Sequence, residues 1–501
     1  MKILKYFLLS IFLLFPPLLT WAGGAKGVSA TGAPLVHSDP THLQWTADSG
    51  PIQTDEPGHD FLSVAAYENY CAIQSSGGGG SGGGCSLSPF IREAMAAASN
   101  NAEAIDLVSQ AWNVWNQAGA NVNVTSSTSK IQINGVETDV NVCNADKVMY
   151  LNTPITEETD PRICGCVRPR PAGCTASCVN PVVFDPNGDI TVKFWQAESA
   201  RIGVLAYTLP LYWPLDNPTK LVGFATVVNG TCLEDKADMA VCPTRWTNAF
   251  LKDTLIHELG HALGLDHSQV NPKGIDLASH QLKAGYTVEA VPMMYPDALQ
   301  SSNGQALIVG QLSADDKASL YHLYPKAGVA SPPCRAVGTV YNNTPAPANF
   351  NLGNPSTRVL RGVEVILRPV TNVVGATTGP SISGAISAVS GVEAANDLYG
   401  NCVITASDPQ GLNCGKFVVD GLQPGLTYTI ETKRIPASFV GGSSYGPYPV
   451  PFQNFTQMDA SGRIVCPMPA VAGVPTILDT STYSALGIQD SYCDASVASC
   501  R

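Results

Sequence analysis

The sequence predicts an α+β domain with a mixed twisted sheet and an active-site helix, followed by an all-β sandwich. Three observations lead to this fold class. Residues 102–117 and 248–263 carry apolar side chains at three- and four-residue steps, which is the spacing of one helix face. Short apolar runs separated by turn residues fill 180–230 and indicate strands of the same domain. Beyond residue 334 the apolar runs have strand character.

Length and composition are those of a multidomain folded protein. The chain has 501 residues, 45% hydrophobic and 14% charged, so two or three domains can each bury a core. The formal net charge is -12 and no basic run occurs, which excludes nucleic acid as a favoured partner. After the first apolar segment, no stretch approaches the roughly 18 apolar residues of a membrane span.

Residues 1–22 have the pattern of a signal peptide. Lys2 and Lys5 precede an apolar run over 6–19, and residues 20–22 offer a cleavage site. An uncleaved membrane anchor is the alternative, but the run is short for a span. We therefore predict a secreted protein, with the periplasm or the cell surface as other destinations.

Fifteen cysteines fit an oxidising compartment. Short separations favour three local pairs, which are Cys71 with Cys85, Cys232 with Cys242, and Cys402 with Cys414. Another group has the composition of a structural zinc site, although disulfides are the favoured interpretation after a signal peptide. Its members are Cys164, Cys166, Cys174 and Cys178.

Shifts in composition divide the chain into segments. Residues 23–41 are small and polar and are predicted to be flexible. The main domain spans 42–327, a linker follows at 328–334, and the sandwich covers 335–440. No fold is assigned to the cysteine-containing tail over 441–501.

Residues 257–267 read HELGHALGLDH and carry the predicted chemistry of the chain. On a helix, His257 and His261 project from one face one turn apart, so both imidazoles can reach one metal ion. Gly264 lets the chain leave the helix, which brings His267 round as a third ligand. Three neutral ligands leave an open position on Zn²⁺, which is the requirement of a catalytic rather than a structural zinc.

Glu258 lies beside these ligands and is the predicted general base. A zinc-activated water attacks a peptide carbonyl while Glu258 takes its proton and then passes it to the leaving amine. The remaining histidines follow no pattern and are interpreted as structural or exposed residues; they are His37, His42, His59, His280 and His322.

The motif, with Ser268 after it, resembles the metzincin clan of zinc peptidases and, within the clan, the matrixin family and its bacterial members. Residues 292–296 (PMMYP) are similar to the methionine turn of that family, in which Met294 would pack beneath the ligands. The stretch 312–324 resembles the last helix of the family. The resemblance implies an α/β/α catalytic domain, one catalytic zinc, and a protein or peptide substrate.

Three departures from the matrixin pattern matter. About 25 residues separate Ser268 from the methionine turn, so an extra loop is expected beside the cleft. Met293 followed by Tyr295 also fits the turn of other metzincins, which keeps Met293 as an alternative to Met294. No Pro-Arg-Cys-Gly segment precedes the domain, so latency through a cysteine thiolate is unsupported.

The matrixin resemblance also implies structural zinc and calcium. The expected upstream His-x-Asp pattern is absent, and the oxygen donors on offer are Asp185, Asn187 and Asp189. A plain turn is the favoured interpretation of these three residues, so calcium is a secondary expectation.

The segments 362–367 and 417–428 resemble, in strand and turn pattern, the transthyretin-like regulatory domains of carboxypeptidases and bacterial surface proteins. This resemblance implies a β-sandwich without chemistry of its own, which acts as a spacer or an adhesion module.

The leading hypothesis is a secreted zinc endopeptidase that acts on extracellular proteins. The first alternative is a secreted adhesion or binding protein with a peptidase-like domain that no longer turns over. The complete set of ligands and Glu258 argue against it. A zinc hydrolase with a non-peptide substrate is the second alternative.

Overall fold

The computed structural model describes residues 25–47, 102–138, 151–232, 247–299, 309–340, 362–369, 384–394 and 412–434, with short gaps inside several ranges, and two strands at 476–477 and 492–493. The signal-peptide prediction for 1–22 and most of the tail lie outside the described residues. Within the described part, no helix has the length and apolar character needed to cross a membrane.

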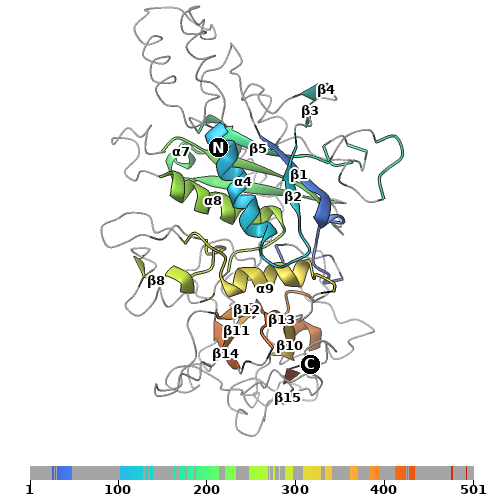
Figure 1. The fold of residues 1–501 in the computed structure, drawn as a ribbon, viewed down its shortest axis with the longest axis vertical. Helices are drawn as coiled ribbons and strands as arrows, with labels where there is room; N and C mark the ends of the chain where they lie inside the picture. Colours follow the sequence, from blue (N-terminus) through green and yellow to red (C-terminus); the bar gives the residue numbers. More distant parts are fainter. Residues whose placement is uncertain are drawn as a thin grey trace, which may run out of the picture.

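The fold is mixed α/β, with a mixed sheet and few helices (Figure 1). The main sheet has the strand order β2-β1-β5-β7-β6. Neighbouring strands are parallel except for β6, which runs antiparallel to β7 at one edge. The strands are β1 (Leu43–Ala47), β2 (Val124–Ser126), β5 (Asn180–Asp185), β6 (Ala206–Trp213) and β7 (Lys220–Asn229).

Side chains alternate between the two faces of this sheet, as the two-residue period of a strand requires. Phe184 and Phe224 join a large core that includes α4 (Ala102–Asn116) and α8 (Asn248–Ala262). Val183 and Val227 lie on the opposite face of the sheet and pack in a second cluster with α6 (Asp189–Trp195). Helices therefore cover both faces, and a short α7 (Ala200–Gly203) follows α6.

The predicted helices are confirmed. The spacing that predicted 102–117 and 248–263 gives α4 and α8, and Trp112 and Trp115 of α4 are core residues, each 1% exposed. The predicted capping box at Ser313 and Asp316 begins α9 (Ala314–Leu323). Between α8 and α9 lie a small ladder of β8 (Ile275–Asp276) with β9 (Gln281–Leu282), and η3 (Val288–Ala290).

Two antiparallel sheets make up the C-terminal β region, which we define as residues 334–434 together with strands β15 and β16. One sheet has the order β13-β10-β16-β15 and the other β12-β11-β14, and residues of both share one apolar core. The strands are β10 (Cys334–Thr339), β11 (Val363–Pro369), β12 (Ile386–Val389), β13 (Lys416–Leu422), β14 (Tyr428–Arg434), β15 (Thr476–Ile477) and β16 (Tyr492–Cys493); η5 (Leu412–Gly415) precedes β13. A separate hairpin joins β3 (Ile131–Ile133) to β4 (Val136–Thr138).

The disulfide interpretation of the cysteine cluster is confirmed. Cys164 is bonded to Cys174, and Cys166 to Cys178. Cys232, Cys334 and Cys414 are also disulfide-bonded. The other members of the predicted local pairs, among them Cys71, Cys85, Cys242 and Cys402, lie outside the described residues.

The described part of 23–41, the segment for which the sequence predicts flexibility, pairs with distant segments of the chain. The backbone amide of Lys26 donates to the Gly264 carbonyl at 2.6 Å, and the Leu221 amide donates to the Val36 carbonyl at 3.1 Å. Leu35, next to Val36, is 2% exposed. The segment ends in the short helix η1 (Pro40–His42). The small polar composition of the segment does not reveal these pairings, because their partners lie nearly two hundred residues or more away in sequence.

The helix α9 lies between the main sheet region and the C-terminal β region (Figure 1). A Cβ on Gly421 of β13 would lie 2.4 Å from the Ala318 Cβ and 2.7 Å from its Cα, so helix and strand approach as closely as a glycine permits. Beside this contact, the His322 ring bonds Asp420 through Nδ1 at 2.5 Å and Glu393 through Nε2. The interface is thus tightly packed and charged.

We expect His322→Gln to lower the free energy of unfolding by about 2 kcal/mol below pH 6.5, because it removes the cation shared by Glu393 and Asp420, of which Asp420 still keeps Arg335 as a partner. Burial alone lowers the pKa of His322, but bonds to Asp420 and Glu393 outweigh it and raise this pKa to about 10. A folded-state pKa above the free value makes the contribution complete below about pH 6.5. It is then lost as pH rises towards 10.

Denaturant unfolding of parent and variant between pH 6 and 10 measures this difference. The matched control is His42→Gln, because His42 bonds Asp39 at 2.8 Å while its side chain is 77% exposed, so the pair contributes little. A stability gap for His322→Gln that stays constant across this pH range would contradict the ion-pair interpretation.

Candidate metal centre

The helix α8 places two of the three predicted ligands. It begins at Thr247, whose hydroxyl accepts from the Phe250 amide at 3.2 Å, and its apolar side packs into the main core. Gly264 has φ +87°, a left-handed conformation that ends the helix and turns the chain back. A Cβ there would lie 3.3 Å from the Leu35 carbonyl oxygen, so the turn also needs the small residue.

The predicted ligands converge. The Nε2 atom of His267 lies 3.1 Å from that of His261 and 3.1 Å from that of His257. Two nitrogens bound to tetrahedral zinc at about 2.0–2.1 Å are about 3.3–3.4 Å apart, so the spacing is close to that of a coordination sphere. These histidines are the only group of three metal-type donors among the described residues.

Backbone carbonyls orient two of the rings. His257 Nδ1 lies 2.8 Å from the Met293 carbonyl oxygen, and His261 Nδ1 lies 2.8 Å from that of Leu265. Since a carbonyl only accepts, each Nδ1 carries the hydrogen, and in a neutral ring Nε2 then presents a lone pair. Neighbouring lone pairs pointing into one space repel each other unless a cation lies between them. The donor set therefore fits a metal ion.

Burial keeps these rings neutral. It lowers the pKa of His257 to about 4, although the bond to Met293 opposes the shift. Burial likewise lowers the pKa of His261 well below its ordinary value, and the charge of Lys26 adds to the effect. At pH 7 both rings are in the form that binds metals.

Glu258 follows His257 on α8 and is 8% exposed. Burial raises its pKa to about 7, and the Lys26 charge and hydrogen bonds from Thr208 oppose the rise. Its Oε2 atom is buried and makes no hydrogen bond among the described residues. A carboxylate with one unbonded oxygen and a pKa near 7 can take up and release a proton at neutral pH.

The methionine turn lies beneath the helix. The Met294 side chain packs at Gly260, between the two helical ligands, while Met293 offers its carbonyl to His257. Asp316 holds the turn, because its carboxylate accepts from the Met293 and Met294 amides at 2.8 and 3.0 Å. Met294 thus contributes its side chain beneath the helix, and Met293 contributes its backbone carbonyl.

We expect Gly260→Ala to lower the free energy of unfolding by about 1–2 kcal/mol, although alanine is the better helix former. The added Cβ would lie 2.3 Å from Met294 Sδ and 2.7 Å from Trp115 Cζ2. Trp115 cannot easily yield, because its Nε1 donates to the Ile256 carbonyl at 2.7 Å.

Thermal unfolding of Gly260→Ala, beside Gly203→Ala, checks this expectation. Gly203 is also helical, but nothing lies within 4 Å of a Cβ built there. The control should therefore be neutral or stabilising. A Gly260→Ala protein as stable as the control would contradict the close packing of the turn.

Two residues near the centre, Lys26 and Thr208, were not predicted from the sequence. Burial lowers the pKa of the Lys26 ammonium, and the nearby charges of Glu258 and Asp266 oppose that shift. Thr208, on the edge strand β6, donates to the Glu258 carbonyl at 2.9 Å. Neither residue carries a local signal of this role, because only the tertiary fold brings it to the centre.

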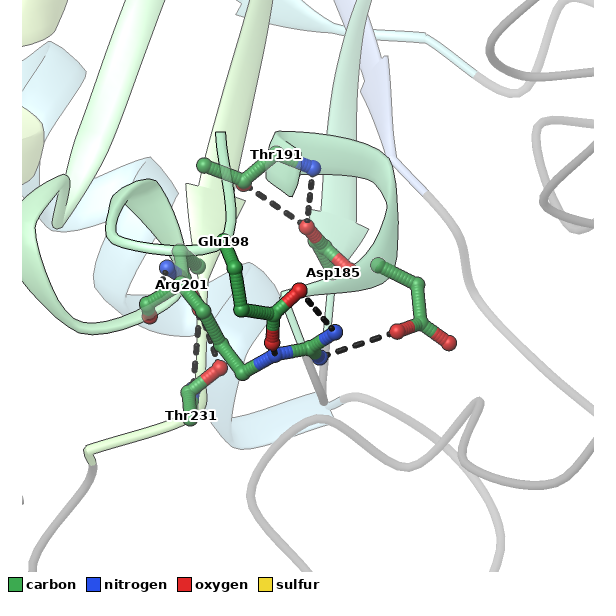
Figure 2. A network of polar contacts seen from close by, with 7 residues as sticks. Asp185, Thr191, Glu198, Arg201 and Thr231 are labelled. Atoms are coloured by element: carbon green, nitrogen blue, oxygen red, sulfur yellow. Dashed lines mark hydrogen bonds and ion pairs between the residues drawn. The ribbon is translucent and has the colours of Figure 1, made fainter. Parts of the chain in front are cut away.

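The predicted calcium donors are placed apart from the histidines. Asp185 is fully buried, and its Oδ2 accepts from the Thr191 amide and hydroxyl, both at 2.7 Å (Figure 2). Asp189 instead pairs with Arg201 at 2.9 Å, and the same guanidinium bonds Glu198. Asn187 lies outside the described residues, so calcium stays a prediction.

No family model, curated protein or solved structure matches this chain. The geometry of the centre and the sequence motif therefore carry the functional argument.

Proposed function

We propose that this protein is a secreted zinc endopeptidase of the metzincin type. The observation that carries the proposal is the convergence of three histidine Nε2 atoms beside a buried glutamate. His257, His261 and His267 would hold the ion. Zinc supplies Lewis-acid activation of water and of the peptide carbonyl. One zinc per chain is expected.

The chain itself supplies proton transfer and substrate orientation. Glu258 Oε2 accepts the proton of the attacking water and then delivers it to the leaving amine nitrogen. The carbonyls of Met293 and Leu265 hold the His257 and His261 rings in the required tautomer.

The position of the edge strand β6 favours a peptide as the substrate over an ester or a small amide. β6 ends the described sheet, and its Thr208 contacts Glu258. An extended peptide can add to such an edge through main-chain hydrogen bonds, with its carbonyl near the histidines. This is support for an endopeptidase, which must bind chain on both sides of the cleaved bond.

The remaining parts of the proposal concern location and the C-terminal β region. Two disulfides, Cys164–Cys174 and Cys166–Cys178, support an oxidising compartment, as does the apolar segment over 6–19. Two antiparallel sheets with a shared core support the proposed transthyretin-like sandwich.

Hydrolysis of casein or gelatin by the purified full chain tests the proposed activity. We expect cleavage after zinc loading, loss of cleavage with a chelator, and recovery when zinc is restored. A zinc-loaded protein that cleaves neither substrate would support the adhesion or binding alternative. Hydrolysis confined to small esters would support the non-peptide hydrolase.

A further inference from the structure

The C-terminal β region reaches the metal centre through a chain of buried polar contacts. Ser268 directly follows the ligand His267, and its hydroxyl donates to Asp315 in the first turn of α9. The other oxygen of that carboxylate accepts from Ser387 of β12, from the amide at 2.5 Å and from the hydroxyl at 3.1 Å. Ser268, Asp315 and Ser387 are 2%, 1% and 6% exposed.

We propose that Ser387 is a positioning residue for the metal ligand His267, which makes the C-terminal β region part of the metal centre rather than an appended spacer. The inference rests on the proposed zinc site. It assigns to the region a function that a strand and turn pattern does not imply.

The first step from Ser387 to the ligand is the carboxylate of Asp315. A buried carboxylate needs hydrogen-bond donors on both oxygens. Ser268 donates to one oxygen of Asp315, and Ser387 donates to the other. Without the Ser387 hydroxyl that oxygen keeps only the Ser387 amide as a donor, so the orientation of the carboxylate towards Ser268 is less firmly fixed. The Ser387 hydroxyl is therefore coupled to Ser268 through a single group.

The second step is the backbone that follows the ligand. The Ser268 amide donates to the Met294 carbonyl at 2.7 Å, so Ser268 joins the ligand segment to the methionine turn. Two residues later, Val270 packs with Ile366 and Ala385 of the C-terminal β region in a small apolar cluster. The segment after His267 thus contacts that region directly at Val270 and is linked to it through Asp315 at Ser268.

The close packing between α9 and the C-terminal β region holds the two in a fixed relative position. A contact at Ser387 can therefore influence the orientation of His267. Gly421 touches Ala318 of α9, and His322 bonds two carboxylates of the C-terminal β region. Asp316, next to Asp315, holds the methionine turn. One helix turn therefore links the C-terminal β region to both the third ligand and the floor of the site.

Zinc affinity of the full chain, measured by competition with a chromophoric chelator, tests this proposal. We expect Ser387→Ala to raise the zinc dissociation constant about three- to tenfold, at or below the low end of the range for partners beyond the ligands. The visible absorption spectrum of the Co²⁺-loaded protein should also change, because the third ligand is less firmly oriented.

The matched control is Ser390→Ala, in the same segment. Ser390 is fully buried and its hydroxyl accepts from the Val363 amide at 3.0 Å, without contact to Asp315. The Ser390→Ala substitution should lower the free energy of unfolding and leave the zinc dissociation constant and the Co²⁺ spectrum unchanged. If Ser387→Ala behaves like this control, its role is structural only and the proposal is overturned.

Combining Ser268→Ala with Ser387→Ala tests whether the two serines act on zinc binding through the same contact. Ser268→Ala alone should weaken zinc binding about tenfold. Because both serines act through Asp315, adding Ser387→Ala should weaken it little further. Fully additive losses would overturn the proposed chain of contacts. A parent protein that binds no zinc would overturn the proposed function as well, which distinguishes the two failures.

Discussion

Glu258→Gln should reduce peptide hydrolysis by about 10³-fold while zinc affinity stays within about threefold of the parent. The amide has the size of the carboxylate but cannot accept the proton of the attacking water. Glu258 contributes no ligand in the proposed centre, since the three converging donors are histidine nitrogens. The loss should therefore appear in kcat, with a small change in KM.

Steady-state hydrolysis of an internally quenched peptide, with zinc content measured on the same samples, checks this result. The matched control is Glu198→Gln, because Glu198 is exposed and pairs with Arg201 away from the histidines. The control should keep full activity. If Glu258→Gln retained more than a tenth of the parent rate with zinc bound, another group would be the base.

The convergence of the three histidines could be predicted from the sequence because the parts of this site are local. His257, Glu258 and His261 lie on two turns of one helix, and a single glycine turn brings in His267. Helix period and the left-handed turn are properties of short segments, so no knowledge of the sheet is needed. The same applies to the capping box that begins α9.

The contacts that depend on the tertiary fold could not be predicted. Lys26 reaches the centre because its amide pairs with Gly264, and Asp315 receives Ser387 from another sheet. In each case the partners are more than 70 residues apart, and one of the two, Lys26 or Ser387, lies in a segment without a recognised pattern. The sequence therefore predicted a C-terminal spacer, while the structure places that region against the ligand segment.

Zinc should stabilise the folded chain strongly, because the ion takes up the Nε2 lone pairs of three ligands that the fold already holds together, with His267 Nε2 3.1 Å from each of the other two Nε2 atoms. The backbone bonds at His257 and His261 keep those lone pairs directed inward even without an ion. Free zinc at 1,000 times its dissociation constant adds about 4 kcal/mol to the free energy of unfolding. We expect a rise in Tm of at least about 5 °C.

Differential scanning calorimetry of the chelator-treated chain, with and without added zinc, measures this rise. His267→Ala should abolish most of it, because two ligands on one helix bind zinc far more weakly than three in tetrahedral geometry. His42→Ala is the matched control, since His42 is exposed and bonds Asp39 outside the centre. It should keep the full shift. An equal zinc-dependent rise in the His267→Ala protein would mean that zinc stabilises the chain at another site, and the three-histidine centre would have to be abandoned.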